Sequence, residues 1–399
     1  MRNFRFLSLS ICAVLLAVIP CTAFAQELKL SGEAKSGVYW EKTQQEGQAS
    51  QAEVRLRSTD DAGGTYDRGR FRLNLDYDNG NNFGFRARIN WEVWNDNAPQ
   101  WPYAFGYGNF FEDQLTISVG RLGGSPWGTG GPEMWKELEQ GQGGGMRTEW
   151  KPSFVPGQLN VGFVLNYFNS DRDQGISKDR QISLLDILEE SVIGISYTYD
   201  YFHARFAYRF DSEIDAQQDN KLTGSKEDEI VYRVEERILN TLLPGFQVWM
   251  LGHWFGVSSS NHKELQLFRN WLFAEYSPPE LGNLTTPFTA QVRFGLDYID
   301  SRSDLYIKPS FYWHLFDKLL SVGGSFQYCQ DFGDGKVYEG SPYRYLEFEP
   351  KIQINFTSSY VAFVYNFKQE YLHPWPGLRE GKDPLKQTQY MNLRFCIYY

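Results

Sequence analysis

The stretch QYMNLRFCIYY, from Gln389 to Tyr399, contains the pattern that decides the fold. Side chains of a β-strand alternate between the two faces of a sheet, so residues two positions apart share a face. One face of this stretch is apolar and comprises Met391, Leu393, Phe395, Ile397 and Tyr399. The other face includes Asn392, Arg394 and Cys396. A period of two with one apolar face predicts a β-strand.

The same alternation recurs throughout the chain. In residues 70–77 and 83–93, large apolar residues alternate with Arg, Asn and acidic residues, and Asn79-Gly80-Asn81 between them predicts a hairpin turn. In all, we expect about 18 strands, with 16 as the main alternative. They span residues 28–40, 70–77, 83–93, 103–110, 114–121, 145–151, 158–169, 191–199, 201–211, 229–239, 245–257, 265–276, 287–299, 304–314, 319–329, 343–356, 360–371 and 388–399.

The composition agrees with interleaved apolar and polar residues. Of 399 residues, 42% are hydrophobic and 17% aromatic, yet the mean hydropathy is −0.48. A helical membrane bundle needs blocks of about 20 mostly apolar residues, which the chain lacks. Disordered chains are poor in aromatic residues. The chain is therefore expected to be all-β.

The predicted connections alternate in length. Residues 79–82, 152–157 and 357–359 form short connections, whereas 41–67, 122–144 and 212–228 are long and polar or Gly-rich. Tight turns at one end and long loops at the other are typical of outer-membrane barrels. Three segments fit poorly: 277–287 is long for a turn, 301–303 is short for a loop, and 52–57 is strand-like within the first loop, as a hairpin or strand extension.

Arginine recurs on the polar face of the strands. In a barrel that spans lipid, apolar side chains point outward and charged ones line a wet lumen, the reverse of a soluble sandwich. We therefore expect a transmembrane antiparallel β-barrel. Its predicted pore wall comprises Arg72, Arg86, Arg88, Arg147, Arg205, Arg209, Arg233, Arg237, Arg269, Arg293 and Arg394.

The N-terminus reads as an export signal. Arg2 and Arg5 precede the apolar run 6–19, and Ala23-Phe24-Ala25 matches a signal-peptidase site, so residues 1–25 are expected to be cleaved. A membrane anchor or a lipoprotein site at Cys21 is the alternative. Residues 26–399 are then a single barrel domain. This domain retains 37 basic and 49 acidic side chains, a balance that argues against nucleic-acid binding.

The export signal and the terminal strand that ends in Tyr399 resemble those of bacterial outer-membrane β-barrel proteins, whose C-terminal assembly signal is a final alternating strand ending in an aromatic residue. Within that class the chain is most similar to porins, without a close subfamily match. The resemblance implies an outer-membrane channel for passive diffusion of small hydrophilic solutes, without a cofactor. It also implies contact with outer-membrane lipid and with the barrel assembly machinery, and a homotrimer as a possible state.

The Gly-rich loop 123–145 is a candidate constriction. In porins, the loop at this position folds into the barrel and narrows it, which here implies that Glu133, Glu137 and Glu139 face the lumen opposite arginines of the wall. Facing rows of opposite charge would set size and charge selectivity. The alternative is that this loop is a lid whose charges are solvated.

Other residues give weaker signals. Tyr39, Trp249, Tyr306 and Tyr312 fall on the presumed lumen face and could form a sugar-stacking track, although aromatic girdles at the membrane interfaces explain them better. A substrate-selective sugar or carboxylate channel, a surface adhesin anchored by a barrel, and a membrane-embedded hydrolase are alternative functions. The five His show no metal or catalytic spacing, so we expect no metal, no cofactor and no catalytic residue.

Two cysteines remain after the signal, Cys329 and Cys396. The first is near the loop end of its strand and the second near the turn end of the last strand. At about 3.3 Å per residue, they lie at different heights in the barrel and too far apart for a disulfide. Both are therefore predicted to be free thiols.

Overall fold

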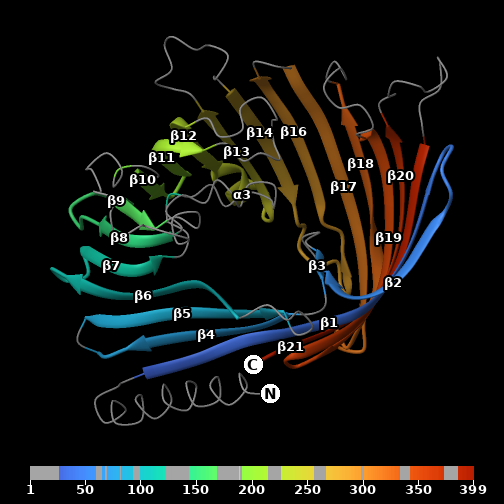
Figure 1. The fold of residues 1–399 in the computed structure, drawn as a ribbon, viewed down its shortest axis with the longest axis horizontal. Coiled ribbons are helices and arrows are strands. Elements are labelled where there is room, and N and C mark those ends of the chain that lie inside the picture. The colour runs from blue at the N-terminus through green and yellow to red at the C-terminus, as the bar shows by residue number, and fades with distance from the viewer. Residues whose placement is uncertain are drawn as a thin grey trace, which may run out of the picture.

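One closed antiparallel sheet forms the molecule, seen in a computed structural model of the chain (Figure 1). The structure describes residues 27–59, 65–67, 70–80, 82–92, 99–122, 127, 143–168, 188, 191–213, 226–255, 267–297, 301–332, 342–372 and 385–399. The predicted signal peptide lies outside these residues. Within them, none of the helices is long and apolar enough to cross a membrane.

Eighteen strands make up the barrel wall, as predicted. They are β1 (Glu27–Gln45), β4 (Arg70–Asp78), β5 (Phe83–Glu92), β6 (Gln100–Phe110), β7 (Leu115–Leu122), β8 (Gly143–Trp150), β9 (Gln158–Phe168), β10 (Val192–Tyr199), β11 (Phe202–Glu213), β12 (Lys226–Glu236), β13 (Phe246–Phe255), β14 (Leu267–Tyr276), β16 (Phe288–Asp297), β17 (Ser301–Leu315), β18 (Leu320–Asp331), β19 (Pro342–Phe356), β20 (Ser359–Leu372) and β21 (Leu385–Tyr398).

Pairing of the first strand with the last closes the barrel. β1 pairs with β21 from Glu33 opposite Tyr398 to Gln45 opposite Lys386, and Figure 1 shows blue β1 beside red β21. Closure pairs both edges of the sheet. A sheet in lipid needs this, because its backbone N–H and C=O groups cannot bond to water there. Tyr399 extends this seam: its hydroxyl donates to the backbone O of Arg72 at 2.8 Å, and its ring stacks on Phe71.

Four short elements lie outside the ring of strands. β2 (Gln51–Thr59) pairs antiparallel with β1 across the turn 46–50, beyond the end of β4, and it also pairs with β3 (Thr65–Asp67). The strand-like segment 52–57 is therefore part of a hairpin in the first connection. β15 (Leu284–Thr285) pairs with β17, which accounts for the long connection 277–287. Finally, α3 (Ile238–Leu242) forms the turn between β12 and β13.

Several predicted strand boundaries were wrong. Residues 41–45, predicted to begin the first loop, continue β1 and pair with β21. Two other boundaries also differ. Residues 301–303 belong to β17, because Ser301 pairs with Leu296 of β16 although these residues show no apolar alternation. Ile238 and Leu239, predicted to end a strand, begin α3, because the sheet pairing of β12 with β13 stops at Glu236 opposite Val248. In both cases backbone hydrogen bonding overrode the side-chain pattern.

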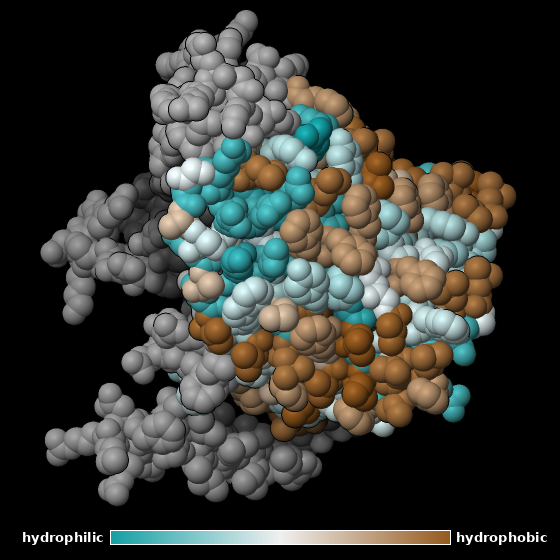
Figure 2. All heavy atoms as spheres, turned by 90° about the vertical axis from the view of Figure 1, so that its right-hand side faces the viewer, coloured by the Kyte–Doolittle hydropathy of each residue, from teal (hydrophilic) through white to brown (hydrophobic). Residues whose placement is uncertain are grey.

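The two faces of the wall differ as predicted for a membrane barrel. On β21, Leu393, Phe395 and Ile397 are 38 to 54% exposed, whereas Asn392, Arg394 and Cys396 are at most 5% exposed. Figure 2 shows the outside of one part of the wall, where brown apolar residues cover much of the surface. Cys329 and Cys396 are both free thiols, as predicted.

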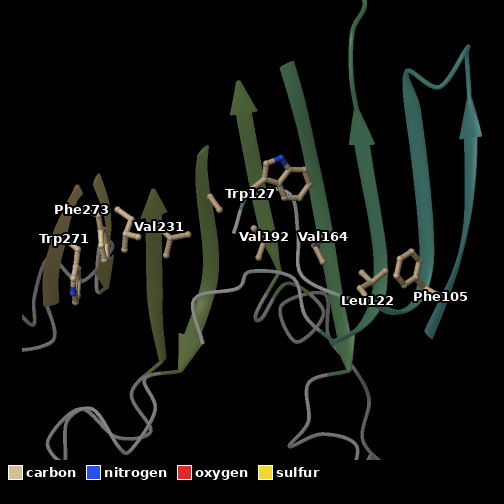
Figure 3. Packing of buried hydrophobic residues seen from close by; sticks show 10 residues of the cluster. Phe105, Leu122, Trp127, Val164, Val192, Val231, Trp271 and Phe273 are labelled. Atoms are coloured by element: carbon tan, nitrogen blue, oxygen red, sulfur yellow. The ribbon is translucent and has the colours of Figure 1, made fainter. Parts of the chain in front are cut away.

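The inner face has an apolar band along half of the ring. Residues directly opposite one another in paired strands share a face, and on this basis the band lies on the same side as the arginines. For example, Val192 is opposite Arg209, and Leu251 is opposite Arg233. This inner apolar band comprises Phe105, Leu122, Val164, Val192, Ala207, Val231, Leu251, Trp271 and Phe273, and Trp127 packs against it (Figure 3).

Candidate functional site

The inner face of the barrel is the candidate site, and its register positions follow from the strand pairings. Ten of the eleven predicted arginines share its register: Arg72, Arg86, Arg88, Arg147, Arg205, Arg209, Arg233, Arg269, Arg293 and Arg394. Arg237 instead lies just after β12, at the N-cap of α3. Tyr39, Trp249, Tyr306 and Tyr312 also lie on the inner register.

Three of these arginines stack on aromatic rings of β6. The guanidinium carbon lies 5.1 Å from the ring centroid for Arg86 over Tyr107, and 5.0 Å for Arg88 over Tyr103. Arg147 lies 5.7 Å from the Phe105 centroid. The face of an aromatic ring attracts a cation, and stacking leaves the edge of the guanidinium open to other partners. We call Arg86, Arg88, Arg147 and these three rings the arginine–aromatic ladder.

Arg88 is the member of the ladder that has no acidic partner in the described part of the chain. Arg86 pairs with Asp76 at 3.4 Å, and Arg147 with Glu149 at 2.9 Å. The Nε of Arg88 donates to the neutral amide oxygen of Asn74 at 2.7 Å. Among the described residues it has no carboxylate within ion-pair distance. As far as the described residues go, its two terminal nitrogens are available to an anion.

A second basic group lies on β11 and β12. Arg205 is directly opposite Arg233, an arrangement of like charges that repel. The Nε of Arg205 lies 2.6 Å from His203 Nε2, and Arg233 pairs with Glu235. Arg233 also lies 5.4 Å from the centroid of the Trp249 ring, which stacks on Phe273. Carboxylates and rings on the same wall therefore offset this repulsion.

Across β17 to β21 the inner wall is acidic and hydrogen-bonded. The Asn366 amide donates to Glu347 at 2.5 Å and to Glu349 at 3.2 Å, and the Tyr390 hydroxyl donates to Glu349 at 2.6 Å. Beside them, Gln327 donates to the Tyr345 hydroxyl at 2.6 Å. We call Asn366, Glu347, Glu349 and Tyr390 the acidic network. The carboxylates of the acidic network accept hydrogen bonds from neutral amide and hydroxyl donors.

Sequence reasoning missed these inner-face acids. Glu149 lies two residues from Arg147, and Glu235 two residues from Arg233, so each shares the face of an arginine that was predicted. Glu347 and Glu349 are likewise two apart on β19. Applying the same parity to acidic residues would have found all four.

The predicted constriction residues Glu133, Glu137 and Glu139 lie outside the described residues. One residue of the same connection, Trp127, is described, and it is fully buried on the inner face. Its indole Nε1 donates to the Asn160 carbonyl at 3.3 Å. The connection between β7 and β8 therefore reaches the inner wall of the barrel at Trp127.

Metal chemistry has no support among the described residues, which contain no group of three or more His, Cys, Asp or Glu placed to hold a metal ion.

At the turn end, the Lys318 amine donates to Glu280 at 2.7 Å. This hydrogen bond and the charge of Lys318 hold the pKa of the exposed Glu280 carboxyl below its ordinary value.

Comparison with known proteins identifies similar folds only. No protein-family model matches the chain, and no curated protein matches it. The anion-selective porin from Comamonas acidovorans has a TM-score of 0.49 at 12% identity, covering 94% of this chain and 99% of its own. The outer membrane channel DcaP of Acinetobacter baumannii has a TM-score of 0.47 at 6% identity, covering 94% and 97%. OmpT of Vibrio cholerae has a TM-score of 0.44 at 8% identity, covering 93% and 97%. At these identities and TM-scores, no residue role is transferred from these proteins to this chain.

Proposed function

We propose that the chain is a porin-like channel of the bacterial outer membrane, through which small hydrophilic solutes diffuse passively. The observation that carries this proposal is the closed barrel of 18 strands with a charged inner register. Barrels of about eight strands fill themselves with side chains, whereas barrels of 16 to 18 strands leave an aqueous channel. An apolar exterior and an arginine-rich interior match a wall between lipid and water.

Planar-bilayer recording of the purified protein tests this function. Discrete current steps at low protein concentration are expected, with a conductance that scales with bulk salt conductivity, as in a water-filled pore. A barrel that inserts but stays electrically silent at all voltages would refute the channel. The same outcome would favour an adhesin or scaffold, in which the barrel serves only as an anchor.

The arginine–aromatic ladder favours a carboxylate-selective channel over a sugar channel as the second candidate. A guanidinium edge presents N–H groups that match a carboxylate, and Arg88 has no acidic partner among the described residues. The inner aromatic rings of the ladder are covered by guanidinium groups, so they are less open to stacking with sugar. Reversal potentials under a salt gradient, and blockade of current by a dicarboxylate or a maltose oligomer, distinguish the two.

The remaining expectations belong to the same proposal. Glu133, Glu137 and Glu139 would narrow the lumen, and neutralising all three should lower the preference for cations. Residues 1–25 would be removed on export, which N-terminal sequencing of the membrane protein checks. The outer face of β21, from Met391 to Tyr399, would serve as the assembly signal, and a trimer would be visible by native mass spectrometry. We assign no catalytic residue and no cofactor.

A further inference from the structure

The outward face of β18 to β21 and β1 separates charge from the inner face of the same strands. The acidic residues of these five adjacent strands all lie on the inner register, among them Asp331, Glu347 and Glu370. Their outward register contains two basic residues, Lys42 of β1 and Arg344 of β19, and no carboxylate. This part of the outer wall is therefore basic, although the chain as a whole has more acidic than basic residues.

One polar residue on each of these strands contributes to a belt on the outward face near the loop end. Neighbouring strands of a barrel are staggered because they are tilted. Along this stagger lie Lys42, Gln387, Gln369, Arg344 and Gln330, on β1, β21, β20, β19 and β18 respectively. We call these five residues the polar belt. Gln387 is directly opposite Gln369, and Arg344 is directly opposite Gln330.

The polar belt lies just beyond the apolar part of the outer wall. Two residues further from the loop end on each strand, the outward positions are Trp40, Gln389, Phe367, Leu346 and Tyr328. Beyond these, Phe348, Phe363 and Leu393 are 38 to 52% exposed on the apolar surface. On the side shown in Figure 2, hydrophilic residues border the grey segments and apolar residues cover much of the rest. An apolar band edged by aromatic residues marks the hydrocarbon region of a barrel, which places the belt at the level of the lipid headgroups.

The chemistry of the polar belt matches a phosphate group. Arg344 stacks on Tyr371, with 4.0 Å between the guanidinium carbon and the ring centroid, and the Gln369 amide donates to the Tyr371 hydroxyl at 2.7 Å. Stacking fixes the plane of the guanidinium, whose edge matches the geometry of a phosphate. The Lys42 side chain is exposed. A carboxylate beside these cations would repel a phosphate, and the outward register of these strands contains none.

We propose that the polar belt binds the phosphorylated headgroups of lipids in the outer leaflet of the membrane, with Arg344 and Lys42 as the phosphate-binding residues. The proposal rests on the outer-membrane location given under the proposed function. It does not depend on the pore, because all five residues lie on the outside of the barrel. The two cations are three strands and about four residues apart, roughly 20 Å between Cα atoms, so they contact different phosphate groups.

Titration of the detergent-solubilised protein with diphosphoryl lipid A, followed by native mass spectrometry, tests the polar belt. Lys42→Gln and Arg344→Gln should each lower the affinity about fivefold and together about 25-fold, because a basic side chain near an anionic lipid surface contributes a factor of about five. Arg121→Gln is the matched control, since Arg121 is an exposed basic residue on the outward register near the loop end of β7. The control should leave the affinity unchanged. Heat-modifiable migration on gels checks that each variant is folded.

Two further probes distinguish a lipid from a free anion. Lipid A without its phosphates should bind the wild type as weakly as diphosphoryl lipid A binds the double variant, and equal affinity for both lipids overturns phosphate recognition. Inorganic phosphate that displaces diphosphoryl lipid A at equal concentration overturns the lipid as the ligand.

The remaining outcomes separate the polar belt from net charge and from the channel. A loss of affinity in Arg121→Gln as large as that in Arg344→Gln overturns the belt as a specific surface, because net charge alone then explains the binding. Lipid binding is measured without any current. If the wild type gives no current steps in planar bilayers but binds diphosphoryl lipid A through Lys42 and Arg344, the channel function fails and the belt stands.

Discussion

Charged side chains on the inner wall are held in two different ways, in the arginine–aromatic ladder of β4 to β8 and in the acidic network of β19 to β21. In the ladder, cations lie on aromatic rings, and Arg88 keeps its terminal nitrogens available. In the network, two carboxylates share the amide of one fully buried asparagine, Asn366. The second arrangement ties charge to neighbouring strands, whereas the first does so less among the described residues. For the proposed channel, we expect the ladder to contribute to selectivity and the acidic network to stability.

The largest expected effect comes from removing the shared donor of the acidic network. Asn366→Leu keeps the volume of a fully buried residue but leaves the half-buried Glu347 without its amide partner. Losing a partner of a buried charge costs the desolvation energy of that charge, about 3 kcal/mol in unfolding free energy. Asn74→Leu, which removes the hydrogen-bond partner of Arg88 beside the ladder, should cost less than about 1 kcal/mol, because water can replace this contact. Denaturant unfolding in detergent measures the unfolding free energy of both variants. Equal losses would contradict the difference between the acidic network and the ladder.

The next effect concerns selectivity rather than stability. A unit charge about 7 Å from an ion path in water changes the energy of one monovalent ion by about 0.6 kcal/mol, a factor of roughly 2.7. Because Cl⁻ and K⁺ feel this charge with opposite signs, Arg88→Gln should lower the Cl⁻ to K⁺ permeability ratio by about sevenfold while unfolding like the wild type. Arg121→Gln is the control, since Arg121 is exposed and its partner Ala104 lies on the outer register. An unchanged reversal potential for Arg88→Gln would place Arg88 away from the ion path.

The sequence predicted the strands far better than the partners on the inner wall. Alternation alone located all 18 wall strands, because a period of two is local. Pairing across strands depends on register, which the residues of a connection such as 277–287 do not reveal by themselves. Trp127 lies in a connection without periodicity, so nothing local indicates its burial. Its signal was indirect: Gly162 and Gly194, which lie against the Trp127 ring, fall on the inner parity of neighbouring strands, where a side chain would otherwise be expected.

A loss of stability smaller than that of Asn366→Leu is expected when one hydrogen bond of the acidic network is removed. Tyr390→Phe removes the donor to Glu349, 2.6 Å away, while the ring remains stacked on Tyr39. A loss of about 1 to 2 kcal/mol in unfolding free energy is expected for a bond to a charged acceptor. Tyr103→Phe is the matched change in the ladder, where the ring rather than the hydroxyl contacts Arg88, and it should be neutral. Equal destabilisation by both variants would show that the hydrogen bond from the Tyr390 hydroxyl to Glu349 does not account for the loss.

The smallest effect is expected outside the lumen, where the ion pair of Glu280 and Lys318 joins two turns in full contact with water. The pKa of Glu280 is lowered in the folded protein by its hydrogen bond with Lys318, so the carboxylate binds protons less readily than in the unfolded chain. Its contribution to stability is therefore present above the unfolded pKa of about 4.3 and is lost as pH falls through the folded value. Glu280→Gln should narrow the difference in unfolding midpoint between pH 7 and pH 3 slightly, and salt should reduce the effect. A loss as large as that of Asn366→Leu would mean that burial does not distinguish the acidic network from an exposed pair.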